Sequence, residues 1–284
     1  MEPKTARWFT EGVETMPDET SVRVLERASQ VLDCFSPTEP RLRIADLRRM
    51  TGLPATTVNR IVKTLVAQDL LQRDGEEYRL GLRVLVWTAP AIAGSQLVAV
   101  AGPVAEQIRD YSGETTGISV HQGVNRVTVV AALSKHSVIF NGYVGQVRPL
   151  HAGASGKIFL AYDQAALDAA LRRGLTRFTD RTTTDADVLR TELAAVRELG
   201  WAFAESENET GLNSLGVPIF GPSGAIVGAL GVGGPSFRLT RQSAEEFAPA
   251  VVAAGLSISQ RLGYTGHLRV EPNASARRAN EQAR

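Results

Sequence analysis

Apolar residues near the start of the chain recur every three or four positions, which is the spacing of amphipathic helices. This spacing predicts three helices, over residues 21–36, 44–50 and 54–68. Gly52 can adopt the left-handed conformation that ends the second helix, and Pro54 suits the first turn of the third, where its missing N–H group costs nothing. We therefore expect the chain to open with a small helical domain.

Residues 70–80 follow the third predicted helix as two short alternating runs on either side of Asp74-Gly75. This dipeptide is typical of a tight hairpin turn. Three helices followed by a hairpin make a winged helix-turn-helix, which we assign to residues 21–82. Residues 83–102 continue as a linker helix that Pro90 interrupts.

The larger section beyond Pro103 changes repeatedly between strand and helix patterns. Strand pairs joined by turns, with helices inserted between them, favour a mostly antiparallel sheet flanked by helices over a doubly wound parallel fold. The predicted fold class is therefore α+β. The expected strands are 117–121, 126–133, 137–140, 201–205, 214–220 and 225–232. Helices are expected within residues 154–172 and over residues 185–199 and 241–262.

Both ends of the chain, residues 1–20 and 267–284, contain few aliphatic side chains and many polar ones, so we expect mobile tails that flank a larger domain over residues 103–266. The first tail also lacks the apolar segment of a signal peptide, and no stretch of the chain reaches about 18 uninterrupted apolar residues. These features predict neither export nor insertion into a membrane. We expect a cytoplasmic protein.

The whole chain has a net charge of only +1, so any attraction to nucleic acid has to come from a local segment. Residues 21–83 contain eleven Lys or Arg against eight Asp or Glu, which makes this segment modestly basic. Cys34 is the only cysteine, which excludes an intramolecular disulfide and a cysteine-rich zinc site. The four histidines show no metal-binding spacing, so we expect neither a metal nor another cofactor.

The side of the third predicted helix opposite its apolar stripe carries groups that can reach DNA bases or phosphates. Arg60 can bind guanine, Asn59 can bind adenine, and threonine can contact a thymine methyl group or a phosphate. Small residues at the start of this helix allow a close approach to the groove. The alternative is a solvated helix face in a module that binds protein. The predicted DNA-contacting residues are Ser21, Arg23, Ala55, Thr56, Thr57, Asn59, Arg60, Lys63, Arg73, Tyr78 and Arg79.

Four small residues, Gly153-Ala154-Ser155-Gly156, precede an apolar helix in the larger domain. Exposed N–H groups and the positive end of the helix dipole make such a helix start a natural site for a carboxylate. The alternative is a helix start that needs small residues for tight packing. His151 is either a donor to a ligand or a buried, hydrogen-bonded structural histidine.

Residues 52–81, GLPATTVNRIVKTLVAQDLLQRDGEEYRLG, resemble the helix-turn-helix and wing of the IclR family of bacterial regulators. The resemblance continues in PLHAGASGKIFLA (149–161), ENETGLNSLGVPIF (207–220) and GALGVGGP (228–235), and covers roughly residues 21–264. It implies a transcription regulator, which we expect to be a repressor, that binds a double-stranded DNA operator as a homodimer or homotetramer. It also implies that the larger domain is GAF-like and binds a small organic effector.

The resemblance also indicates which residues contact the effector, including the amides of Ala154 and Ser155. Members that bind very small acids such as glyoxylate carry a carboxylate where this chain has Ala204, and two serines where it has Gly231 and Gly233. The loss of these polar groups favours a larger and less polar effector, such as an aromatic acid or amide. The predicted effector-binding residues are Phe140, Tyr143, His151, Ala154, Ser155, Gly156, Leu212, Ser214, Gly231 and Gly233.

A hydrolase that uses Ser155 as nucleophile, with Lys157 or His151 as base, is the alternative from another functional class. Ser155 lacks the GxSxG elbow, and Lys157 follows it by two residues where an SxxK motif requires three. No acid partner is specified either, so no catalytic residue is predicted. A third class, a protein-interaction adaptor, would leave Arg60 and Lys63 without a role.

Overall fold

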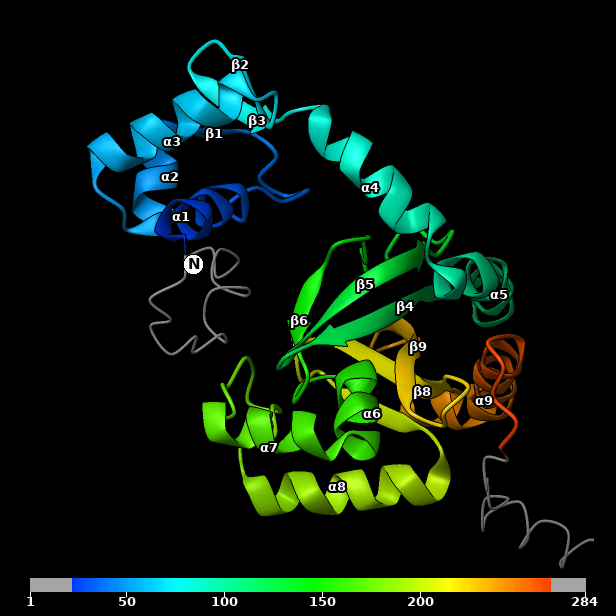
Figure 1. Cartoon of the computed structure of the whole chain (residues 1–284). Helices are drawn as coiled ribbons and strands as arrows, with labels where there is room; N and C mark the ends of the chain where they lie inside the picture. The colour runs from blue at the N-terminus through cyan, green and yellow to red at the C-terminus, as the bar shows by residue number, and fades with distance from the viewer. Residues whose placement is uncertain (1–21, 267–284) are drawn as a thin grey trace, which may run out of the picture. The chain divides into compact units, whose positions relative to one another are not determined.

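A computed structural model describes residues 22–266, which divide into two compact units at the boundary between Ser95 and Gln96 (Figure 1). The expected tails, residues 1–20 and 267–284, and the predicted DNA contact Ser21 lie outside the described residues. Each unit has its own apolar core. We therefore describe each unit by itself.

The first unit is a winged helix-turn-helix, as the sequence predicts. Its sheet has the order β1-β3-β2, with antiparallel neighbours. The left-handed conformation of Gly52, with φ of 69°, ends the second helix as expected. The elements are α1 (Arg23–Leu32), β1 (Leu42–Arg43), α2 (Ile44–Thr51), α3 (Ala55–Ala67), β2 (Leu71–Asp74), β3 (Glu77–Leu80) and α4 (Arg83–Ala93).

Two details of this unit differ from the sequence prediction. Helix α1 ends at Leu32, and the first part of its apolar stripe is not covered, because Val24 and Leu25 are 55% and 65% exposed. The linker helix over residues 83–102, which we expected to be interrupted at Pro90, is interrupted at Gly94 and Ser95 instead. Helix α4 passes through Pro90 without ending there, and α5 (Gln96–Ser112) belongs to the second unit.

The second unit is built on one six-stranded sheet in the order β6-β5-β4-β9-β8-β7, with antiparallel neighbours throughout. Helices α5 and α9 cover one face, and α6 lies on the other face with α7 and α8 packed beyond it (Figure 1). This arrangement confirms the predicted α+β class. The elements are β4 (Thr115–Gln122), β5 (Asn125–Ala132), β6 (Val147–Pro149), α6 (Ala154–Tyr162), α7 (Gln164–Arg173), α8 (Ala186–Leu199), β7 (Ala202–Glu205), β8 (Leu212–Phe220), β9 (Ile226–Pro235) and α9 (Arg241–Arg261).

One element of the second unit was predicted wrongly. Residues 137–140 form a loop and not a strand, and the edge strand is β6, ten residues further along the chain. The helices expected within residues 154–172 are α6 and α7, which are separate because Asp163 adopts an extended conformation between them. Its carboxylate accepts the Ala166 N–H at 3.0 Å and so caps the second of these helices.

Glycines let the start of α6 lie directly on the sheet. Gly216 of β8 and Gly231 of β9 are paired across the two strands. A Cβ atom on Gly216 would come within 2.9 Å of the Ser155 amide nitrogen, and one on Gly231 would come within 2.3 Å of Ser155 Oγ. Within α6 itself, a Cβ atom on Gly156 would lie 2.2 Å from the Leu150 carbonyl oxygen. Tight packing therefore explains Gly156 and the two strand glycines.

Among residues 22–266, no single helix is both long enough and apolar enough to cross a membrane. Helices α4 and α5 pass that test of length and composition only when they are taken together across the bend between them.

Candidate nucleic-acid interface and ligand cavity

Helix α3 separates its apolar and polar residues onto two sides. Val58, Ile61, Val62 and Leu65 are buried in the core of the first unit. Thr56, Asn59, Arg60 and Lys63 are exposed, whereas Ala55 and Thr57 are partly buried. Within the described chain neither Arg60 nor Lys63 forms an ion pair, so both charges are free to meet a phosphate or a base edge.

The hairpin places its two predicted arginines on opposite faces. Arg73 pairs with Tyr78 across β2 and β3, and Arg79 pairs with Gln72, one position along. Since side chains alternate between the faces of a strand, only Arg73 shares the face on which Tyr78 packs against the core. Arg79 Nη2 donates to Gln72 Oε1 at 3.0 Å on the outer face. Arg23, at the start of α1, is exposed.

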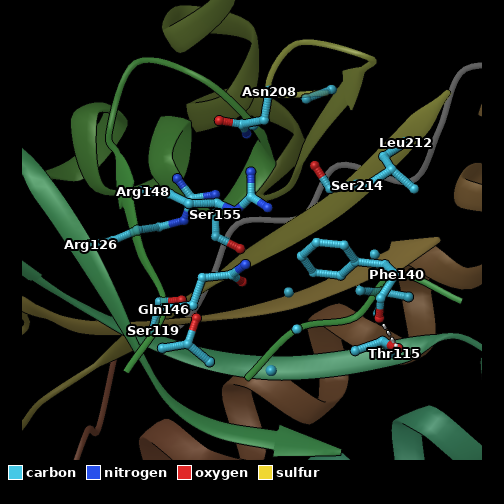
Figure 2. A pocket seen from close by; sticks show the side chains of 18 of the residues that line it. Thr115, Ser119, Arg126, Phe140, Gln146, Arg148, Ser155, Asn208, Leu212 and Ser214 are labelled. Carbon is cyan, nitrogen blue, oxygen red and sulfur yellow. Dashed lines mark hydrogen bonds between the residues drawn. The ribbon is translucent and has the colours of Figure 1, made fainter. Parts of the chain in front are cut away.

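The second unit contains a cavity on the side of the sheet that α6 covers (Figure 2). Its volume is about 90 Å³, several times the space that one water molecule needs. All six strands of the sheet, the start of α6, and the loops before β6 and β8 supply its walls. Of the predicted effector-binding residues, the cavity is lined by Phe140, Ser155, Leu212, Ser214, Gly231 and Gly233, and not by Tyr143, His151, Ala154 or Gly156.

His151 lies outside the cavity in a structural environment. It is buried, its Nε2 lies 2.9 Å from the Thr176 carbonyl oxygen, and its ring stacks on Phe178 at 5.6 Å. Burial lowers its pKa, so the neutral ring is favoured. These contacts agree with the structural alternative for this histidine.

The N–H groups at the start of α6 are partly engaged by the protein. The Ala154 amide donates to Ser214 Oγ at 3.1 Å, and the Gly153 amide donates to Glu207 Oε2 at 3.0 Å. Gly153 has a φ of 83°, and a Cβ atom there would lie 2.3 Å from the Asn208 side-chain nitrogen. The side chains that surround this helix start therefore take two of the donors that the sequence offered to a ligand.

Two arginines line the cavity that the sequence analysis did not identify. Arg126 of β5 is 8% exposed, and its Nη1 donates to the carbonyl oxygens of Pro149 at 2.7 Å and Ala152 at 3.1 Å. Arg148 of β6 lies 5.4 Å above the Phe140 ring, and its buried Nε has no hydrogen-bond partner. Burial and the neighbouring charge of Arg148 lower the pKa of Arg126 to about 9, and burial also lowers the pKa of Arg148.

The signal for these arginines was present in the sequence. Arg126 is a lone charge at the start of the otherwise apolar run VTVVAA, and Arg148 directly precedes the PLH motif. A charge within a predicted buried strand needs a partner or a ligand. The sequence did not show that the two residues share one cavity.

A buried ion cluster lies beside the cavity. Lys157 of α6 is 3% exposed and contacts both Glu207, in the loop before β8, and Glu192 of α8, with Nζ 2.8 Å from the Glu192 Oε2. Burial raises the pKa of Glu207, and the Lys157 charge opposes this shift. The cluster ties α6 and α8 to the loop that carries Glu207, Asn208 and Glu209 into the cavity wall.

Gly231 and Gly233 of β9 do not leave the extra space that we expected from the loss of two serine side chains. Ser155 Oγ already occupies the space that a side chain on Gly231 would take, and the Phe140 ring lies 2.8 Å from a Cβ atom placed on Gly233. Ala204 also lines the cavity. Arg126 and Arg148 add polar groups to the wall that the sequence analysis did not count, and the larger, less polar effector stays a prediction.

The cavity has a polar end and an apolar end (Figure 2). Arg126, Arg148 and Ser155 lie together at one end, and Gln146 and Ser119 lie below them. Phe140 and Leu212 lie at the other end. This arrangement suits a small amphipathic molecule with one polar group and an apolar body.

The residues of the hydrolase alternative are not arranged for catalysis. Lys157 is held by two carboxylates, and the hydrogen bond of His151 goes to a backbone carbonyl instead of to Ser155. Neither residue offers Ser155 the base that a nucleophilic serine requires. The described residues also contain no group of three or more His, Cys, Asp or Glu side chains that could hold a metal ion.

Two family models match this chain and confirm the resemblance seen in the sequence. The model for the IclR helix-turn-helix domain matches residues 24–75, and the model for the bacterial transcriptional regulator IclR C-terminal domain matches residues 89–260. Both models describe transcription regulators and not hydrolases.

Similar proteins of known name or structure span nearly the whole chain. The transcriptional repressor AllR of Escherichia coli strain UTI89 is 29% identical over 87% of this chain and 92% of its own length. The regulator XynR of E. coli K12 is 28% identical over 86% of this chain and 98% of its own. A putative IclR regulator from Silicibacter sp. TM1040 has a crystal structure with a TM-score of 0.73 and 31% identity, covering 88% of this chain and 100% of that one. An IclR homologue from Microbacterium hydrocarbonoxydans, solved in complex with 4-hydroxybenzoate, has a TM-score of 0.70 and 26% identity, covering 84% of this chain and 98% of that one.

Proposed function

Because this chain belongs to the IclR family of transcriptional regulators, with a DNA-binding and an effector-binding domain, we propose that it is a repressor whose operator affinity is set by an organic acid or amide of moderate size. The observation that carries the DNA-binding part is the two-sided character of α3. Its apolar side is buried, which directs Asn59, Arg60 and Lys63 outward. A recognition helix needs this arrangement to enter the major groove.

The N-terminal part of α3 is the proposed reading surface. Thr56, Asn59 and Arg60 face outward along its first turns and read bases, while Lys63 and Arg79 bind phosphates. Arg23 is a further candidate for a phosphate contact, because it is exposed at the start of α1. Tyr78 supports the wing from the core side instead of binding DNA directly.

The effector is proposed to lie in the cavity with its apolar part against Phe140 and Leu212. A relative with 26% identity was crystallised with 4-hydroxybenzoate, an aromatic acid, which supports an effector of this size class. Regulation then requires the effector to favour one arrangement of two recognition helices over another.

The regulator is proposed to act as a homodimer or homotetramer in the cytoplasm, where its operator lies. One winged module covers only one half-site, so two copies are needed to read a palindromic operator. Apolar residues that the described chain leaves exposed, Val24 and Leu25 on α1 and Leu85, Val86 and Trp87 on α4, support self-association. Light scattering on the purified protein tests this point.

Fluorescence anisotropy with the DNA upstream of the protein's own gene tests the proposed function. We expect specific binding that Arg60→Ala weakens by about 1–3 kcal/mol, or about 5- to 150-fold. Arg172→Ala is the matched control, because Arg172 is an exposed arginine on α7, outside the DNA-binding domain. Binding that Arg60→Ala leaves unchanged contradicts the assignment of α3, and failure to bind any DNA selected from a random pool contradicts the function itself.

A further inference from the structure

The strongest unexplained feature of the second unit is a pair of like charges on neighbouring strands. Arg126 and Arg148 lie directly opposite each other in the register of β5 and β6. Side chains at directly opposed positions point to the same face of a sheet, and both arginines line the cavity. Like charges in this position destabilise a sheet, so packing alone gives no reason for the pair.

No carboxylate of the described chain forms an ion pair with Arg126, although the nearby charge of Glu207 favours its charged form. None lies within 4.0 Å of its guanidinium, and Glu207 gives its oxygens to Lys157 and to the Gly153 amide. Two backbone carbonyls accept from Nη1, but the other nitrogens of this guanidinium form no hydrogen bond with the described chain. A buried cation without an ion-pair partner is costly, and an anion in the cavity would lower that cost.

Arg148 also lacks partners for its charge and for its hydrogen-bond donors. Its Nε is buried without a hydrogen-bond partner, and its nearest carboxylate, on the largely exposed side chain of Glu209, lies 3.9 Å away. The side chain of Arg126 donates to the carbonyl oxygens before α6, whereas the side chain of Arg148 forms no hydrogen bond with the described chain. A carboxylate between the two arginines offers acceptors to both sets of free donors.

We propose that Arg126 and Arg148 together bind a carboxylate of the effector, so that the protein responds to organic acids and not to the corresponding amides or alcohols. This inference rests on the proposed function. The proposed function allows either an acid or an amide as effector, and the arginine pair selects the acid. The carboxylate lies at the arginine end of the cavity, and the apolar body of the acid extends toward Phe140 and Leu212 (Figure 2).

Calorimetric titration of the purified full-length protein with matched pairs of ligands tests this proposal. The probes are benzoate and 4-hydroxybenzoate, each against its own amide, followed by aliphatic acids and their amides. We expect the acid that binds best to bind about 10- to 100-fold more tightly than its amide, because charge-assisted hydrogen bonds are the stronger ones. We expect Arg148→Met to remove most of that difference while it leaves the affinity for the amide within about threefold.

Arg148→Met is the main variant because the side chain of Arg148 forms no hydrogen bond with the described chain, and the backbone pairing of β6 is kept. Arg126→Lys is the second variant; it keeps the charge but cannot bind a carboxylate through two parallel hydrogen bonds, and we expect it to weaken acids only. Arg172→Met, on the exposed surface of α7, is the matched control and is expected to bind acids as the unaltered protein does. Circular dichroism establishes that each variant is folded.

The possible outcomes separate this inference from the proposed function. Amides that bind as tightly as acids, acids that bind Arg148→Met without loss, or failure of every acid to bind would each overturn the arginine assignment. If a neutral ligand changes the affinity for DNA in the anisotropy assay, the regulator function stands even though the arginine assignment fails. Conversely, carboxylate binding by a protein that binds no DNA supports the arginine pair and contradicts the regulator.

Discussion

Replacement of Lys157 by methionine tests whether the buried ion cluster holds the wall of the cavity in place. Lys157 pairs with both Glu207, whose side chain is 8% exposed, and Glu192, whose side chain is 36% exposed. Removing one partner of a buried ion pair typically costs about 3–5 kcal/mol, because the other charge remains buried. Since Glu192 is partly solvated, we expect the lower end, about 3 kcal/mol at pH 7.5. In a unit of this size that loss lowers Tm by about 6–12 °C.

The loss of stability has a defined dependence on pH. Burial already raises the pKa of Glu207, and without Lys157 that pKa rises further. A carboxyl group whose pKa is raised in the folded state favours folding when it is protonated, and this contribution disappears as pH rises through the folded pKa. The variant is therefore expected to differ least from the unaltered protein near pH 4.5, the ordinary value of Glu207, and most above pH 7.

Urea denaturation at several pH values measures the effect. Lys157→Met combined with Glu207→Gln removes both charges, and we expect this double variant to recover part of the lost stability. Lys135→Met is the control, because Lys135 pairs with Asp110 at 2.8 Å but is 75% exposed, and it should cost less than about 0.5 kcal/mol. A Lys157→Met protein within about 0.5 kcal/mol of the unaltered one at pH 7.5, or one with the same deficit at pH 5, would refute this reasoning.

Three further substitutions test other parts of the structure. Gly156→Ala places a Cβ atom 2.2 Å from the Leu150 carbonyl oxygen, so we expect a loss of about 2–3 kcal/mol in urea denaturation; a neutral result contradicts the close packing of α6. Burial raises the pKa of Asp33 to about 6, so its carboxyl group stabilises the fold below about pH 4 and this contribution is lost as pH rises through 6. Asp33→Asn should therefore gain about 1 kcal/mol at pH 7.5, allowing for partial exposure, and nothing near pH 4; equal effects at both values contradict this. Phe140→Ala removes the ring that covers Gly233 and should weaken aromatic acids about 10-fold in calorimetry without changing DNA affinity in the absence of ligand, whereas unchanged acid affinity places the ligand elsewhere.

The sequence by itself determined the elements whose patterns are local. The apolar period of α3 fixes both the residues that are buried and, because the opposite side has to face outward, the polar residues offered to DNA. Gly52 and the Asp74-Gly75 turn fix where α2 ends and where the wing reverses, since each depends on backbone conformations that few residues adopt. Motifs spread along both domains were enough to indicate the family.

Only the tertiary structure decided what the cavity contains. The edge strand β6 has three residues, too few for a periodic pattern, and the sequence placed a strand ten residues too early. Without that strand, the pairing of Arg126 with Arg148 could not be seen, because the residues lie 22 positions apart and meet only through the register of β5 and β6. In the same way, Gly231 and Gly233 suggested open space in the sequence, whereas Ser155 and Phe140 fill it from other elements. Local pattern fixes which face a side chain occupies, but the neighbours it meets there depend on strand register and on the packing of distant segments.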